Sequence, residues 1–262
     1  MAQTKHDIIQ WNCRGFGANK EELRQLAHSY PPSVICLQET FLSDDQTTIN
    51  PYISHHCFSV SANTGRPIGG ASVLVHHTLS HSRIPINTNL QAVACRVELH
   101  KSITICSVYI PPNFDFSIQQ IQDLFDQLPS PVLLLGDFNA HSELWGNGRE
   151  DRRGGFLETF ISNNFLCLFN DESPTYCHPA SGSLTSIDLS ISSPLIFPDF
   201  SWSVHDDLCG SDHFPLFLQC KGLVDNNRCP TWNLKKKPTG IFLKKNAWKT
   251  FLPETLLFRL IQ

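Results

Sequence analysis

The sequence predicts an α/β fold in which β-sheets are covered by helices on their outer faces. Short, mostly β-branched apolar runs alternate with helix-like stretches along the first 220 residues. Clusters of Gly, Pro and Ser bound the apolar runs, as they do at the ends of strands. Hydrophobic residues make up 41% of the 262 residues, which is enough for a packed core. Elements that alternate in this way pack as layers of sheet and helix.

Eight runs fit the pattern of short strands bounded by turn residues. They are residues 7–11, 34–38, 71–76, 92–99, 103–109, 132–135, 187–191 and 214–220. Three stretches are predicted helices, at residues 20–29, 117–128 and 155–163. The second carries apolar residues at helical spacing, and Ser117 suits its N-cap position.

Charge divides the chain into two parts. Residues 1–220 contain 11 Lys or Arg and 22 Asp or Glu, a net charge of −11, whereas residues 221–262 contain 9 and 2, a net charge of +7. We predict one globular domain over 1–220 and a basic, turn-rich linker over 221–262. An acidic body binds a polyanion poorly. A protein of this kind that acts on nucleic acid needs a cation in its site and local basic contacts.

The ten cysteines form no C-x-x-C pair, and several lie inside apolar strand-like runs. Buried free cysteine behaves as a small hydrophobic residue, whereas zinc sites usually contain closely paired thiolates. We therefore expect core cysteines, with a cysteine nucleophile left open as an alternative. The sequence also lacks the G-x-S-x-G, Walker-type, G-x-G-x-x-G and H-E-x-x-H motifs, which weakens the case for those chemistries.

No apolar stretch approaches the roughly 18 residues that a transmembrane helix requires. The first twelve residues lack the apolar segment of a secretory signal. We therefore expect an intracellular protein with no membrane partner.

Polar side chains interrupt or follow the apolar strands at their ends. They are Asn12, Glu39, Tyr109, Asp137, Asn139, Asp188, Asp212 and His213. Each alone has an ordinary structural explanation, but strand ends at one edge of a sandwich can converge on one place. Carboxylate and amide oxygens gathered there suit a hard divalent cation such as Mg²⁺ or Mn²⁺.

Several motifs together resemble the endonuclease/exonuclease/phosphatase superfamily. They are QWN (10–12), LQET (37–40), VYIPP (108–112), LLGDFNAH (134–141), SPTY (173–176), SIDL (186–189) and GSDHFP (210–215). The resemblance covers residues 6–220. It implies a four-layer α/β/β/α sandwich with the site at one end of two facing sheets, as in deoxyribonucleases and AP endonucleases.

The resemblance also implies a role for each matching residue. The expected metal ligands are Glu39, Asn12 and Asp212. The expected catalytic residues are Asp137, Asn139, His213, Asp188 and Tyr109. Thr175 and Ser211 match accessory positions at the phosphate, which Asn139 and Tyr109 also contact. Asp137 would orient or deprotonate the attacking water, and Asp188 would hold His213.

The segment WGNGREDRRGG (145–155) and the basic tail resemble the jockey-like branch of non-LTR retrotransposons. This branch implies a Mg²⁺-dependent endonuclease that nicks double-stranded DNA in the nucleus and leaves a 3′-hydroxyl primer. Its partner would be a reverse-transcriptase domain of the same polyprotein, which the sequence here does not include. Two alternatives stay open: an abasic-site or RNA phosphodiesterase of the same superfamily, and a non-catalytic nucleic-acid-binding module. Loops 144–154 and 178–185 are expected to touch DNA, without a readable sequence code.

Overall fold

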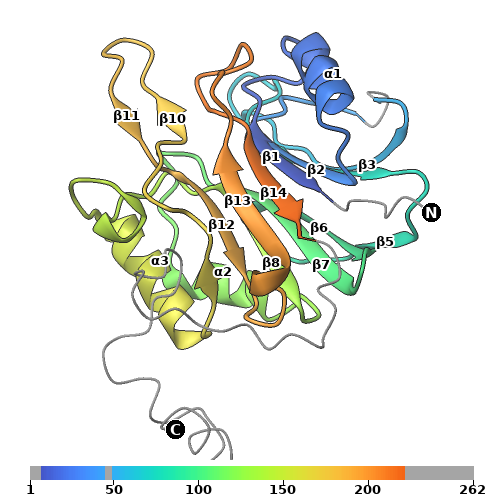
Figure 1. Cartoon of the computed structure of the whole chain (residues 1–262). Coiled ribbons are helices and arrows are strands. Elements are labelled where there is room, and N and C mark those ends of the chain that lie inside the picture. The colour runs from blue at the N-terminus through green and yellow to red at the C-terminus, as the bar shows by residue number, and fades with distance from the viewer. Residues whose placement is uncertain (1–6, 45–48, 222–262) are drawn as a thin grey trace, which may run out of the picture.

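The computed structural model describes residues 7–44 and 49–221 of the chain. Two six-stranded sheets lie face to face, and helices cover both outer faces (Figure 1). This arrangement is the four-layer α/β/β/α sandwich that the sequence predicts. The predicted tail, residues 221–262, falls outside the described residues except for Lys221.

The first sheet has the strand order β13-β14-β1-β2-β4-β3. Its strands in chain order are β1 (Ile8–Asn12), β2 (Val34–Gln38), β3 (Tyr52–Cys57), β4 (Ala71–His76), β13 (Phe200–Val204) and β14 (Leu216–Cys220). The central pair β1 and β2 is parallel, and the other pairs are antiparallel.

The second sheet has the strand order β5-β6-β7-β8-β12-β9. Its strands are β5 (His81–Ile84), β6 (Gln91–Glu98), β7 (Ser102–Tyr109), β8 (Val132–Asp137), β9 (Cys167–Leu168) and β12 (Asp188–Ser192). Only β7 and β8 are parallel among its pairs of described strands. A separate hairpin of β10 (Tyr176–Cys177) and β11 (Leu184–Thr185) stands out from the body (Figure 1).

Three hydrophobic clusters hold the four layers together. One fills the space between the sheets and includes Val73 and Leu135. A second packs α1 (Lys20–Ser29) on the first sheet, through Leu23 and Leu26. A third packs α2 (Ile118–Phe125) and α3 (Arg152–Asn163) on the second sheet. Two short 3₁₀ helices, Glu143–Trp145 and Phe197–Asp199, complete the described elements.

The helix ends follow from their capping residues. Ser117 caps α2, since its hydroxyl accepts a hydrogen bond from the Gln120 amide and the Gln120 side chain accepts from the Ser117 amide. This confirms the predicted N-cap. Helix α3 begins three residues before the predicted start, because the Asp151 carboxylate accepts a hydrogen bond from the Gly154 amide and nucleates the first turn.

All eight predicted strands exist, with small shifts at their ends. Asp137 is the last residue of β8 rather than a residue beyond it. The last strand begins at Leu216 rather than at residue 214, because the Phe214 amide donates to Thr175 and Pro215 has no amide hydrogen.

Six strands were not predicted: β3, β5, β9, β10, β11 and β13. Three of them, β9, β10 and β11, have only two residues each, and the other three are half-exposed, with polar sequences such as YISHHC and HSRI. The edges of the sheets therefore lack the apolar signal that the sequence analysis depends on.

The nine cysteines in the described part of the chain are free. Cys13, Cys36, Cys95 and Cys106 are buried in the hydrophobic clusters, as predicted, and the other five are half-buried. Burial raises the pKa of Cys13 to about 12, so this thiol stays protonated at neutral pH. Within residues 7–44 and 49–221, no helix has both the length and the apolar character to cross a membrane.

Candidate active site

The topology brings the predicted polar residues to one end of the sandwich. Parallel strands β1 and β2 end at Asn12 and beside Glu39, and parallel strands β7 and β8 end at Tyr109 and Asp137. Strand β12 runs in the opposite direction, so its first residue, Asp188, lies directly opposite Asp137 in the register. Both sheets therefore contribute side chains to the same place.

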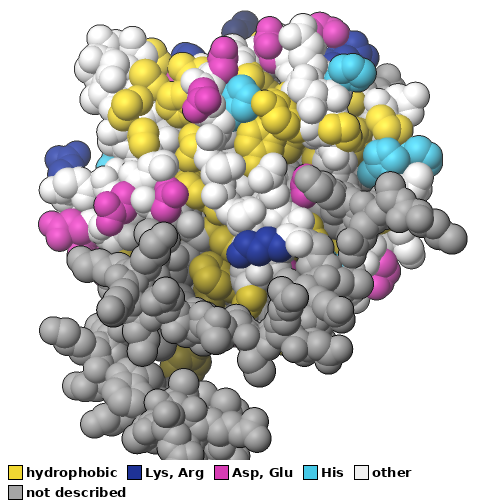
Figure 2. Space-filling model, viewed as in Figure 1, with side chains coloured by type: hydrophobic (Ala, Val, Ile, Leu, Met, Phe, Trp, Pro, Cys, Tyr) yellow, Lys and Arg dark blue, Asp and Glu magenta, His cyan; other side chains and the backbone are white. Residues whose placement is uncertain are grey.

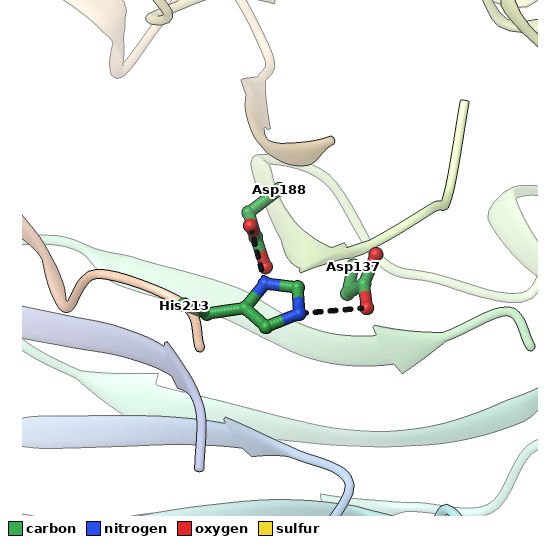
Figure 3. Close-up of side chains that lie close together, drawn as sticks. All are labelled: Asp137, Asp188 and His213. Carbon is green, nitrogen blue, oxygen red and sulfur yellow. Dashed lines mark hydrogen bonds and ion pairs between the residues drawn. The ribbon is translucent and has the colours of Figure 1, made fainter. Parts of the chain in front are cut away.

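Asp137, Asp188 and His213 form a buried group, which we call the acid–histidine group (Figure 3). His213 Nδ1 lies 2.8 Å from Asp188 Oδ2, and His213 Nε2 lies 3.9 Å from Asp137 Oδ2. One ring nitrogen thus faces each carboxylate. The exposed fractions of Asp137, Asp188 and His213 are 1%, 1% and 4%.

Burial and mutual repulsion change the protonation of this group. Burial and then the neighbouring Asp188 carboxylate raise the pKa of Asp137 to about 7, although His213 opposes the change. Burial alone would lower the pKa of His213, but Asp188 and then Asp137 outweigh that effect and raise it to about 9. Near neutral pH the histidine is therefore charged, while Asp137 can gain or lose a proton.

The Thr175 hydroxyl, itself held by two backbone amides, keeps the Asp188 carboxylate in place. Thr175 Oγ1 donates to Asp188 Oδ2 at 2.6 Å and accepts from the amides of Ile187 and Asp188 at 3.1 Å. The other oxygen, Asp188 Oδ1, is buried and has no hydrogen-bond partner in the described structure. The carboxylate is thus fixed toward His213.

The backbone around His213 is equally constrained. Ser211 Oγ donates to the Asn12 carbonyl at 2.7 Å and accepts from the His213 amide at 3.2 Å. Trp11 Nε1 donates to the His213 carbonyl at 3.0 Å. The Tyr176 ring lies against the imidazole, with centroids 4.7 Å apart. His213 lies in the loop before β14, which begins at Leu216. These contacts, rather than strand pairing, therefore hold its ring in place.

We call four further predicted residues, Asn12, Glu39, Tyr109 and Asp212, the carboxylate rim. Tyr109 donates its hydroxyl to Glu39 Oε1 at 2.7 Å, and burial followed by the Glu39 charge raises the pKa of Tyr109. Asn12 Nδ2 donates to Asp137 Oδ2 at 2.8 Å and so joins the rim to the acid–histidine group. Glu39 and Asp212 are only half-buried.

Asn139 lies between these groups and the chain that follows β7. Its Nδ2 donates to Asp137 Oδ2 at 3.1 Å and to the Ile110 carbonyl at 3.2 Å. Its own amide donates to Asp137 Oδ1 at 3.0 Å. Both oxygens of Asp137 therefore accept hydrogen bonds, which orients this carboxylate.

The backbone adopts a left-handed conformation at two residues of the site. Glu39 has a φ of 50° and Asn139 a φ of 48°, values that a residue with a side chain seldom adopts. Gly69, with a φ of 58°, lies so close to Tyr109 that an added Cβ would be 2.8 Å from the ring. The site therefore depends on backbone conformations that are costly elsewhere in a protein.

Two sets of side chains offer metal ligands. The ligand atoms of Asp137, Asp188 and His213 all lie within 4.8 Å of one another. Both ring nitrogens of His213 face carboxylates, and this arrangement favours proton chemistry in that group. The rim contains the carboxylates of Glu39 and Asp212 and the amide oxygen of Asn12, and hard oxygen donors of this kind suit Mg²⁺ or Mn²⁺. In this structure Asn12 Oδ1 accepts from the Arg14 amide at 3.1 Å, and Asp212 Oδ2 lies 3.4 Å from Arg14 Nη1.

Comparison with known proteins places the chain in a family. Residues 103–217 match the family described as Endonuclease-reverse transcriptase. The chain is 31% identical over 181 residues, 67% of its length, to the RNA-directed DNA polymerase from mobile element jockey of Drosophila melanogaster. It is 28% identical over 253 residues, 94% of its length, to the corresponding protein of Drosophila funebris. The matched regions span 19% and 26% of these two relatives.

The fold agrees with these matches. The endonuclease domain of TRAS1, a telomere-specific non-LTR retrotransposon, superposes with a TM-score of 0.70 and 21% sequence identity, over 84% of this chain and 100% of that chain. This chain belongs to the endonuclease/exonuclease/phosphatase superfamily, in its non-LTR retrotransposon branch. The sequence motifs predicted this membership.

The structure also shows site residues that the superfamily motifs in the sequence did not single out. Tyr176 belongs to the SPTY motif, but only its neighbour Thr175 was predicted to act. Arg14 was not considered, although its Nη1 lies 3.4 Å from Asp212 Oδ2. A basic residue two positions after Asn12 was visible in the sequence, but nothing in the local pattern pointed to an aspartate 198 residues away.

The surface of this superfamily domain offers few basic residues to a polyanion. On the face in Figure 2, basic side chains of the described residues occur singly among acidic and hydrophobic ones. This agrees with the net charge of −11 over residues 1–220.

Proposed function

We propose that this domain is a metal-dependent DNA endonuclease that hydrolyses a phosphodiester bond of target DNA. The observation that carries the proposal is the acid–histidine group, in which a buried carboxylate with a pKa of about 7 faces a charged histidine. A carboxylate that titrates near neutral pH can act as a general base, and a charged histidine beside it can stabilise an anionic phosphate ester during hydrolysis.

Asp137 is proposed to accept a proton from the attacking water. Hydrogen bonds from Asn12 and Asn139 to its two oxygens restrict rotation of the carboxylate. His213, charged and held by Asp188, is proposed to donate to a non-bridging phosphate oxygen through Nε2. The Asp188 contact fixes the orientation of the ring, as an aspartate does in other catalytic triads.

Glu39, Asn12 and Asp212 are proposed to hold Mg²⁺ or Mn²⁺. When bound, the ion supplies positive charge that neutralises the charge developing on the phosphate oxygens. Tyr109 is proposed to contact the scissile phosphate, since its hydroxyl already lies against Glu39. Asn139 would donate to the same phosphate.

Thr175 and Ser211 act on the site through other residues. Thr175 holds Asp188, and Ser211 links the His213 amide to the Asn12 carbonyl. We propose that they support the geometry of the phosphate site, and that their removal changes the position of His213 rather than a direct phosphate contact.

The relatives suggest why such a cut would be useful. The jockey proteins carry the name of an RNA-directed DNA polymerase, and such an enzyme extends a free 3′-hydroxyl. We propose that the domain nicks double-stranded DNA in the nucleus and leaves 3′-hydroxyl and 5′-phosphate ends for a reverse-transcriptase domain of the same polyprotein. Water rather than a protein side chain is the nucleophile, so no covalent protein–DNA intermediate forms.

The test is nicking of a supercoiled plasmid with Mg²⁺, with Mn²⁺ and with EDTA. We expect open-circular product with either metal and none with EDTA, and a DNA polymerase should extend the product without end repair. Turnover in EDTA would contradict the metal requirement. Extension only after treatment with a 3′-phosphatase would show that the leaving group is the 5′-oxygen.

Two other functions are separated by the choice of substrate. An abasic-site enzyme would cleave a duplex with an abasic site much faster than an intact duplex, and an RNA phosphodiesterase would prefer RNA. A non-catalytic binding module would bind DNA without turnover under all of these conditions. The buried base and charged histidine favour the hydrolytic proposal over the last of these.

A further inference from the structure

Arg153 is a half-buried cation that forms no ion pair with the carboxylates of residues 7–44 and 49–221. Its guanidinium donates instead to three consecutive backbone carbonyls. Nη2 lies 3.0 Å from the Ile110 oxygen, and Nη1 lies 3.0 Å and 2.9 Å from the oxygens of Pro111 and Pro112. The Phe116 ring covers the guanidinium, with the centroid 5.1 Å from Cζ.

The segment 110–112, which follows β7, has few hydrogen-bond donors of its own. Pro111 and Pro112 have no amide hydrogen, so this segment can be hydrogen-bonded there only through its carbonyls. Arginine presents five N–H donors in a rigid planar fork, whereas lysine presents a single ammonium. One arginine can therefore fix all three carbonyls at once.

The same segment is connected directly to the proposed catalytic residues. Tyr109 is the residue before Ile110. The Ile110 carbonyl also accepts from Asn139 Nδ2 at 3.2 Å, and the same Nδ2 donates to Asp137 Oδ2 at 3.1 Å. The Ile110 amide donates to the Asp137 carbonyl at 2.9 Å. A displaced Ile110 would therefore disturb Tyr109, Asn139 and Asp137 together.

The backbone around Arg153, at the start of α3, is fixed to the loop that follows β8. The Asp151 amide donates to the His141 carbonyl at 2.9 Å, and His141 Nδ1 lies 2.9 Å from Asp151 Oδ2. At Gly154, an added Cβ would lie 1.9 Å from the His141 oxygen, so only glycine allows this approach. The start of α3 thus contacts both loops that carry the site.

We propose that Arg153 is a positioning residue of the nuclease site, which holds Tyr109 and Asn139 in place relative to Asp137. The inference rests on the proposed function, because it assigns a role within that reaction. It also makes a structural claim that can be tested without turnover: the guanidinium fixes the segment 110–112, and through it the Tyr109 ring.

The kinetic test compares Arg153→Lys and Arg153→Met with Arg96→Met. Arg96 is the matched control, because it is also a half-buried arginine and donates to two consecutive backbone carbonyls, Pro129 at 2.9 Å and Ser130 at 3.2 Å. Its contacts lie at the ends of β7 and β8 that are away from Tyr109 and Asp137. Both Arg153 variants should lower kcat for plasmid nicking about 10- to 100-fold with KM changed little, since displacing reacting groups by about 1 Å can cost that much. Arg96→Met should keep kcat within about twofold, because the carbonyls that it holds are remote from the proposed reacting groups.

The second measurement follows the tyrosine rings by NMR in protein with ¹³C-labelled tyrosine. The chain has four tyrosines, and Tyr52, on β3, serves as the internal reference. The Tyr109 signals should shift or broaden in both Arg153 variants and stay unchanged in Arg96→Met. Partial recovery of kcat in Arg153→Met with millimolar guanidinium would show that the planar guanidinium group itself holds the three carbonyls.

Each outcome decides a different claim. If the wild-type chain and the Arg96 variant nick DNA and the Arg153 variants match them, the positioning role is wrong. Unchanged Tyr109 signals in both Arg153 variants also overturn it. If no form of the chain nicks DNA, the proposed function fails, and the tyrosine signals still decide whether Arg153 fixes the segment. Should Arg153→Met not fold, Arg153→Lys keeps the charge and supplies both measurements.

Discussion

The two halves of the site contain similar chemical groups in different surroundings. Asp137 and Asp188, in the acid–histidine group, are 1% exposed, whereas Glu39 and Asp212, in the carboxylate rim, are half-buried. Burial beside a second carboxylate raises the pKa of Asp137 to about 7. The difference in burial supports the separate roles that we propose, proton transfer at Asp137 and cation binding at the rim.

The largest expected effect comes from the buried half. Asp137→Ala and His213→Ala should each lower the nicking rate by about 10³-fold, because each removes a fixed acid–base or electrostatic group. Higher Mg²⁺ should not restore the rate. The measurement is single-turnover nicking, with His28→Ala, an exposed histidine at the end of α1, as the matched control. A rate in Asp137→Ala equal to the wild-type rate would remove Asp137 from the mechanism.

The rim should respond differently to metal. Glu39→Gln should lower nicking by about 10²-fold at low Mg²⁺, on the scale of losing one electrostatic contribution to the transition state. Raising the Mg²⁺ or Mn²⁺ concentration should recover part of this loss, because the substitution weakens binding of the ion rather than proton transfer. The test is the metal dependence of the rate in both variants. Equal and unrecoverable losses for Glu39→Gln and Asp137→Ala would mean that the two halves do not have separate roles.

The pKa of His213 provides a direct measure of the buried half. In metal-free protein, NMR should show His213 titrating at about 9. Asp188→Asn should lower this pKa, because it removes the charge and the hydrogen bond that raise it. Since the folded pKa exceeds the usual value of about 6.5, His213 stabilises the fold below about pH 6.5 and this contribution is lost as the pH rises through about 9.

Asp188→Asn should therefore flatten that part of the stability curve. Urea unfolding of the wild-type and variant proteins across this pH range measures the difference. A wild-type His213 that titrates near its ordinary pKa would show that the two carboxylates do not act on it as the geometry indicates.

The smallest expected effect is at Asp212, at the outer edge of the rim. Its carboxylate lies 3.4 Å from Arg14, which is itself largely exposed, and surface ion pairs contribute only about 0–1 kcal/mol. Asp212→Asn should lower nicking less than about tenfold and leave the unfolding free energy within about 1 kcal/mol. Plasmid nicking at limiting Mg²⁺ is the sensitive assay. A loss as large as that of Glu39→Gln would make Asp212 a principal ligand of the rim.

The sequence predicted the layers of the fold better than their edges. Central strands such as β2 and β8 begin with continuous apolar runs, VICL and VLLL, because they are covered on both faces. Edge strands such as β3 and β5 are half-exposed, so their sequences carry polar residues and no clear alternation. Helix α2 was recognisable from its apolar stripe and its Ser117 cap, whereas the Asp151 cap of α3 lies within a run of charged residues.

The apolar pattern pointed to site residues where they end strands, and the superfamily motifs added Asn139, Thr175, Ser211 and His213. Asn12, Glu39, Asp137 and Asp188 stand out because a polar residue interrupts an apolar run. Arg153 acts on backbone carbonyls about 40 residues away in the chain, and a contact of this kind leaves no local pattern in the sequence. The pKa values depend on burial and on distances between sheets, so they required the three-dimensional structure.

The left-handed backbone at Glu39 and Asn139 has a consequence for how such a domain changes once selection for activity is lost. Each of these conformations costs the folded state about 1 kcal/mol or more in a residue with a side chain, and glycine or asparagine relieves part of that cost. In a copy of the element released from selection, replacement of Glu39 by glycine would remove a proposed metal ligand and at the same time relax the backbone. Decay of the site and a gain in folding stability would then proceed together, so an inactive descendant could outlast its active parent as a folded protein.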